Sequence, residues 1–149
     1  MANSSKTVDV LRELINTCRD GEKGFAQAAE KIRSTDLKSL FRQYGGERQR
    51  FANQLEIEVG KLGEEVHKDE GHVAGAIHRT WLNVKESMGA DDHSILASVE
   101  QAEDTAKESY QNALQAALPD HLMTIVRQQA ESVFRAHDGI RAMRDQRAA

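Results

Sequence analysis

Apolar residues recur at intervals of three and four along four stretches of the chain. This spacing places them on one face of an α-helix and is typical of amphipathic helices. It predicts helices over about residues 8–33, 37–62, 93–118 and 120–143. The prevalence of Ala, Glu, Gln, Leu, Lys and Arg, all good helix formers, agrees with an all-α fold.

The predicted helices are bounded by residues that cap or stop helices. Ser34 and Thr35 follow the first helix and offer side-chain oxygens for the start of the second. Asp91 or Asp92 can cap the third helix in the same way. Pro119 ends the third helix and suits the start of the fourth.

A long connection, residues 63–90, separates the second helix from the third. Structureless loops of this length are rare in compact domains, so a short helix is expected over about residues 73–88. The other two links are short, so each flanking pair of helices is antiparallel. A crossover as long as the bundle then gives an up-down-down-up order, which is the ferritin-like four-helix topology. We expect one domain over residues 1–149.

The first part of the crossover is polar and carries a short tract of metal-ligand residue types. Such tracts bind metals weakly, and a solvated loop is the favoured interpretation. The tract consists of His67, Asp69, Glu70 and His72.

Composition excludes several classes of partner. Charged residues make up 30% of the 149 residues, and the net charge is −4, with both signs interspersed. A nucleic-acid partner is therefore not expected. No stretch approaches the ~20 apolar residues of a membrane span, and no signal peptide is apparent, so a cytoplasmic location is expected. Cys18 is the one cysteine, which excludes an intrachain disulfide. A homo-oligomer remains open.

Each predicted helix has a polar residue where the apolar stripe calls for a hydrophobic one. With up-down-down-up order, Glu22, Glu47, Glu103 and His137 come to similar heights in the bundle. Carboxylates and an imidazole on facing helices can hold a divalent ion such as iron, manganese or zinc. The residues expected around these four ligands are Arg48, Arg50, Glu100 and Asp138.

Five glycines lie beside those polar residues: Gly21, Gly24, Gly45, Gly46 and Gly139. A glycine inside a helix costs about 1 kcal/mol relative to alanine. Close backbone approach or a local bulge would account for this cost. The alternative is that Gly45 and Gly46 simply break the second helix.

A metal-free interpretation of the same charges is also open. Glu22 and Glu103 can pair with Arg48 or Arg50 in a buried ion network, and His137 can be a hydrogen-bonded core residue. Two function classes follow from these alternatives. One is a metal-binding bundle, with redox activity towards iron as an option; the other is a non-catalytic, stress-related or interaction protein.

Nearly the whole chain resembles a family of small bacterial ferritin-like four-helix-bundle proteins of unknown function. The resemblance implies the bundle fold. In the di-iron ferritin pattern, two helices each supply Glu and two supply Glu-x-x-His. Here Arg50 follows Glu47 and Phe134 precedes His137 at those spacings, so a full di-iron ferroxidase is not expected. The segments that carry the resemblance are 20–25 (DGEKGF), 28–30 (AAE), 75–81 (GAIHRTW), 100–104 (EQAED) with Tyr110, and 137–141 (HDGIR).

Overall fold

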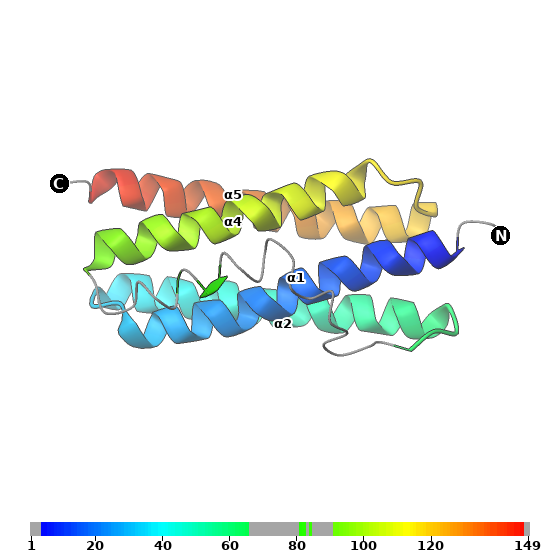
Figure 1. Cartoon of the computed structure of the whole chain (residues 1–149), viewed down its shortest axis with the longest axis horizontal. Coiled ribbons are helices and arrows are strands. Elements are labelled where there is room, and N and C mark those ends of the chain that lie inside the picture. Colours follow the sequence, from blue (N-terminus) through cyan, green and yellow to red (C-terminus); the bar gives the residue numbers. More distant parts are fainter. Residues whose placement is uncertain (1–3, 66–80, 83, 85–90, 148–149) are drawn as a thin grey trace.

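A computed structural model describes residues 4–65, 81, 82, 84 and 91–147 of the chain. Four long helices make up this part of the molecule: α1 (Ser4–Lys31), α2 (Thr35–Lys61), α4 (Asp92–Leu114) and α5 (Asp120–Gln146). They lie side by side as a four-helix bundle (Figure 1). The described residues contain no strand, so the all-α fold predicted from the sequence is confirmed.

The helix directions give the predicted order. α1 and α5 run one way along the bundle, and α2 and α4 run the other way (Figure 1). The closest packing is within the pairs α1–α2 and α4–α5. Between the pairs, α1 packs against α4, and α2 makes the fewest contacts with α5. The bundle is therefore two antiparallel helix pairs joined mainly through their buried faces.

Two predicted caps and one glycine hold three of the helix boundaries. The Ser34 hydroxyl accepts a hydrogen bond from the Leu37 amide at 3.3 Å, which starts α2. The Asp91 carboxylate accepts from the Ser94 amide at 2.9 Å, which starts α4. Gly63, past the end of α2, has φ +79°, a backbone angle that glycine adopts without strain.

Two helix ends differ from the prediction. α4 ends at Leu114 rather than near residue 118, with Gln115 as its C-terminal cap. α5 continues past residue 143 to Gln146. In this added turn Arg144 forms an ion pair with Glu100 of α4 and lies at the helix end that favours positive charge.

α2 passes through Gly45 and Gly46 without interruption, so these glycines do not break the helix. The core that it helps to form contains Leu11, Phe25, Phe41, Val99, Tyr110 and Val133. Trp81 and Val84 from the crossover are also buried in this core. Apart from Trp81, Leu82 and Val84, the predicted crossover helix lies outside the described residues. So does the tract of His67, Asp69, Glu70 and His72.

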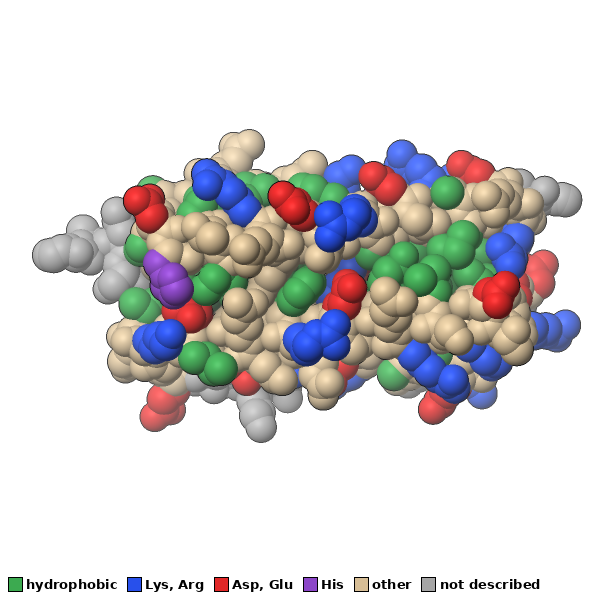
Figure 2. Space-filling model, turned by 180° about the vertical axis from the view of Figure 1, so that it is seen from behind, with side chains coloured by type: hydrophobic (Ala, Val, Ile, Leu, Met, Phe, Trp, Pro, Cys, Tyr) green, Lys and Arg blue, Asp and Glu red, His purple; other side chains and the backbone are tan. Residues whose placement is uncertain are grey.

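Acidic and basic side chains are interleaved over the face of the bundle that Figure 2 presents. Among the described helices, none is long and apolar enough to cross a lipid bilayer.

Candidate functional site

The centre of the bundle holds a buried ion pair between the two helix pairs. Arg48 of α2 donates two hydrogen bonds to Glu103 of α4, from Nη1 to Oε2 at 2.8 Å and from Nη2 to Oε1 at 2.5 Å. The side chains are 1% and 0% exposed. This two-bond geometry uses both carboxylate oxygens and matches the fork of the guanidinium. Of the two cations expected to compensate the buried carboxylates, Arg48 does so and Arg50 is exposed.

Glycine and an aromatic ring make room for the Arg48 guanidinium. A Cβ atom added to Gly21 would lie 3.1 Å from Arg48 Nη1 and 3.4 Å from its Cγ. On the other side, Arg48 Cζ lies 5.4 Å from the centre of the Phe25 ring, within the range of a cation–π contact. The glycine at position 21 therefore has a packing reason, close approach of a long buried side chain to the α1 backbone.

A chain of neutral hydrogen bonds continues from this level of the core. Cys18 Sγ lies 3.1 Å from Tyr110 Oη, and Tyr110 donates to Gln129 Oε1 at 2.7 Å. The Gln129 amide then donates to Gln54 Oε1 at 2.9 Å. These bonds link all four helices and satisfy the polar groups that burial would otherwise make costly.

Burial shapes the acid–base properties of this level. It raises the pKa of Cys18 to about 11 from 9.0, with the Arg48 charge acting in the opposite direction. It also raises the pKa of Tyr110 well above 10.0. Burial alone would lower the pKa of Arg48, but the charge and hydrogen bonds of Glu103 outweigh it and the pKa rises. The thiol and phenol are thus held neutral and the guanidinium is held charged.

The other residues predicted as metal ligands do not join Glu103. Glu22 lies partly exposed and pairs with Arg19 on its own helix at 3.1 Å. Glu47 is partly buried, and its side chain forms no hydrogen bond or ion pair with any described residue. No three of the four predicted ligands bring ligand atoms within 4.8 Å of one another.

His137, the fourth predicted ligand, belongs to a different cluster between α4 and α5. Its side chain is 1% exposed, and both ring nitrogens face carboxylates. Nε2 lies 2.5 Å from Asp104 Oδ1, and Nδ1 lies 3.1 Å from Asp138 Oδ1. The hydrogen bond with His137 lowers the pKa of Asp138, and the Lys107 charge adds to this effect.

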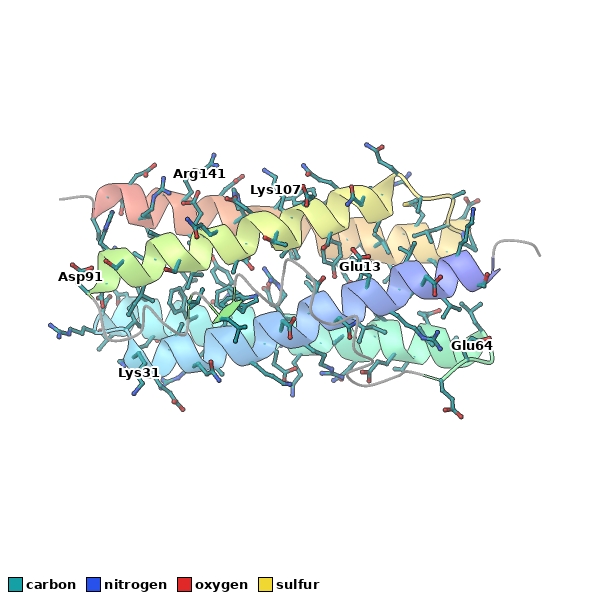
Figure 3. The ribbon with its side chains drawn as sticks, in the orientation of Figure 1. Glu13, Lys31, Glu64, Asp91, Lys107 and Arg141 are labelled. Carbon is teal, nitrogen blue, oxygen red and sulfur yellow. The ribbon has the colours of Figure 1, made fainter. Side chains whose placement is uncertain are left out.

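Glu100 completes this cluster. It is buried, and it accepts hydrogen bonds from Arg141 Nε at 3.0 Å and from Arg144 Nη1. Arg141 lies on the side of α5 away from α1 and α2 (Figure 3). One ligand atom each from Glu100, Asp104 and His137 lies within 4.8 Å of the others, and no other such group of three occurs among the described residues.

Sequence reasoning did not select Asp104, Arg141 or Arg144 as site residues. A signal was present, because Glu100 and Asp104 are four residues apart and therefore share one face of a helix. Arg141 and Arg144 share a helix face in the same way. That the two faces meet depends on the rotation of α4 against α5, which the periodicity leaves undetermined.

Comparison with known proteins agrees with the resemblance in outline. A search of curated proteins found no match. The family described as Domain of unknown function (DUF2383) matches residues 6–116, which cover nearly all of α1 and the whole of α2 and α4. The chain is therefore a member of the DUF2383 family.

Proposed function

We propose that this chain is a non-catalytic helical-bundle protein with a metal-free ion network at its centre. It acts through its surface, by binding partners or by self-association. The observation that carries the proposal is the pair of hydrogen bonds between Arg48 and Glu103. A carboxylate compensated in this way has no net charge left to attract a metal into the core.

The reactivity of the buried groups supports a non-catalytic role. Catalytic thiols and acids usually have pKa values shifted towards reactivity near neutral pH. Here burial moves the pKa of Cys18 to about 11 and that of Tyr110 upward, so neither group ionises near neutral pH. Among the described residues, those with shifted pKa values thus include no activated nucleophile in the core.

A core metal site is the competing proposal. It would use Glu22, Glu47, Glu103 and His137 to bind iron, manganese or zinc. To do so, Arg48 would have to leave Glu103, and Glu22 would have to leave Arg19. Removing a partner from a buried charge costs about 3–5 kcal/mol, so the geometry favours the ion network. A ferritin-like ancestry is compatible with either proposal, because the helix order is the same.

Urea unfolding of core variants separates the two proposals. In the ion network, Glu103→Gln leaves Arg48 without a counter-charge, and the free energy of unfolding should fall by about 3–5 kcal/mol. The double variant Arg48→Met/Glu103→Met should recover most of this loss, because it removes both charges together. A core metal site predicts instead that Glu103→Gln leaves the metal-free protein unchanged or more stable.

Two further measurements complete the test. Any stabilisation by added Zn²⁺, Mn²⁺ or Fe²⁺ should survive in Glu22→Gln, because the proposal gives Glu22 no metal. Oxidation of Fe²⁺ by oxygen, followed by absorbance, should be no faster with the protein than without it. Loss of the metal effect in Glu22→Gln, or accelerated oxidation, would favour the core metal site.

A further inference from the structure

The cluster between α4 and α5 has a different character from the core pair. Its three ligand-type side chains, Glu100, Asp104 and His137, come from two helices that are packed directly against each other. Glu100 and His137 are buried, whereas the Asp104 side chain is 56% exposed. The cluster therefore combines two buried side chains that can bind a metal with an opening to solvent.

The histidine at its centre has an unusual set of neighbours. A neutral imidazole carries one N–H group and one bare nitrogen. When the hydrogen atom is on Nδ1 and bonds to Asp138, the lone pair of Nε2 faces Asp104 Oδ1 at 2.5 Å. Two electron-rich atoms at this distance repel each other unless a positive ion lies between or beside them. A second proton meets this requirement at 2.5 Å. A metal ion, with bonds of about 2 Å to each ligand, meets it once the exposed Asp104 carboxylate moves to about 3 Å from Nε2.

Asp138 is placed to orient the His137 ring. Metal-binding histidines usually donate their other ring N–H to a carboxylate, which fixes the ring and strengthens the bound nitrogen as a ligand. The 3.1 Å contact of Asp138 with Nδ1 is of this kind. It leaves the Nε2 lone pair directed towards Asp104.

From this geometry we propose a divalent transition-metal site formed by Glu100, Asp104 and His137. One imidazole nitrogen and two carboxylate oxygens form a donor set that suits zinc and related first-row ions. Three protein ligands leave further coordination positions for water on the side where Asp104 is exposed. The site is separate from the core pair, since it uses neither Glu103 nor Arg48.

Arg141 and Arg144 set the strength of this site. Each donates to Glu100 and neutralises part of the charge that a cation would meet. A carboxylate has about four lone-pair positions, so Glu100 can keep both arginines and still offer one position to a metal. The arginines weaken the site without closing it, and removing one of their charges should strengthen metal binding.

Calorimetric titration of the full chain, prepared without a histidine tag, with Zn²⁺ tests the proposal. Asp104→Asn and Glu100→Gln should each raise the dissociation constant at least tenfold. Asp104→Asn is the main variant, because the exposed side chain can change without loss of the fold. Asp138→Asn should weaken binding by about tenfold through the imidazole, in line with other residues that orient a ligand. Arg141→Gln should lower the dissociation constant.

Two control variants each remove a carboxylate charge outside the proposed site. Glu131→Gln alters an exposed carboxylate on α5 that pairs only with Arg135 among the described residues, and it should leave Zn²⁺ binding unchanged. Glu22→Gln should also bind as wild type does. With Co²⁺ as a probe, the visible d–d absorption of the bound ion should appear in wild type and disappear in Asp104→Asn.

Three results would overturn the site. One is the absence of Zn²⁺ binding in wild type and in Arg141→Gln. Another is binding that Asp104→Asn does not change. The third is binding lost in Glu22→Gln but kept in Asp104→Asn, which would place the metal in the core and contradict the proposed function as well. In the first two cases the metal-free core remains unaffected.

Discussion

In the α1–α2 pair, small and aromatic side chains pack closely, whereas the α4–α5 pair has buried polar contacts beside its apolar ones. A Cβ atom added to Gly45 would lie 3.3 Å from Phe25 Cβ, and the Phe25 ring lies 5.6 Å from the Phe41 ring. Between α4 and α5, by contrast, His137 meets Asp104 at 2.5 Å and Tyr110 donates to Gln129.

The difference bears on what each pair can do. The Phe25 Cβ atom leaves little space at Gly45, so this part of the α1–α2 pair is suited to a fixed structural role. In the α4–α5 cluster, which is partly exposed, a carboxylate can exchange one positively charged partner for another. Arg48 and Glu103 connect the two pairs through the closed part of the core, and the α4–α5 cluster lies where solvent ions can arrive.

Among the substitutions that test this comparison, Gly24→Ala in α1 should lower the free energy of unfolding most. The added Cβ would lie 2.2 Å from Trp81 Cε3. This is far inside van der Waals contact, so the ring would have to shift. Overpacking of this kind costs typically 1–3 kcal/mol, and we expect about 3 kcal/mol because a rigid ring must shift. Urea unfolding followed by circular dichroism measures the loss, with Trp81 fluorescence reporting the displaced ring. An unchanged midpoint would show that Trp81 packs against α1 less tightly than described.

An intermediate effect is expected from Cys18 of α1, which contacts Tyr110 of α4 between the two helix pairs. Burial raises the pKa of Cys18 from 9.0 to about 11, so the folded state keeps its proton at pH values where the unfolded chain loses it. The stabilisation is therefore complete below pH 9 and is lost as the pH rises towards 11. The loss is of the order of 1 kcal/mol for each pKa unit.

Comparison with Cys18→Ala isolates this contribution. Between pH 8 and pH 11 the free energy of unfolding of wild type should fall more steeply than that of the variant. Equal slopes would mean that the thiol ionises as readily in the folded protein as in the unfolded chain.

The smallest effect, and a gain, is expected for Gly46→Ala in α2. Among the described residues, and apart from the chain neighbours and the helix's own backbone, only Arg50 Nη1 lies within 4 Å of the added Cβ, at 3.7 Å, so the site has room. Replacing an interior helix glycine by alanine then stabilises the helix by about 1 kcal/mol or less. A rise of a few degrees in the melting temperature would fit. A fall would show that Gly46, like Gly24, faces a close neighbour.

Sequence periodicity went far in predicting the fold. It gave the four helices, the Ser34 and Asp91 caps, and the continuity of α2 through its two glycines. It also predicted four inward-facing polar residues, of which Glu103 and His137 are buried, whereas Glu22 and Glu47 are partly exposed. These features depend on local sequence, because a helix stripe and a cap are written within a few neighbouring residues.

The partners of these residues were decided by the tertiary structure. Glu103 meets Arg48, Glu22 turns to Arg19 at the surface, and His137 lies between Asp104 and Asp138. Periodicity gives the face and the approximate height of a residue, but a slide of one turn, about 5.4 Å, brings a different residue opposite it. Long side chains such as arginine then reach across more than one turn. The sequence alone determined the helix stripes that carry Glu103 and His137 into the bundle, and only the packing of α4 against α2 and α5 determined which charges neutralise each other.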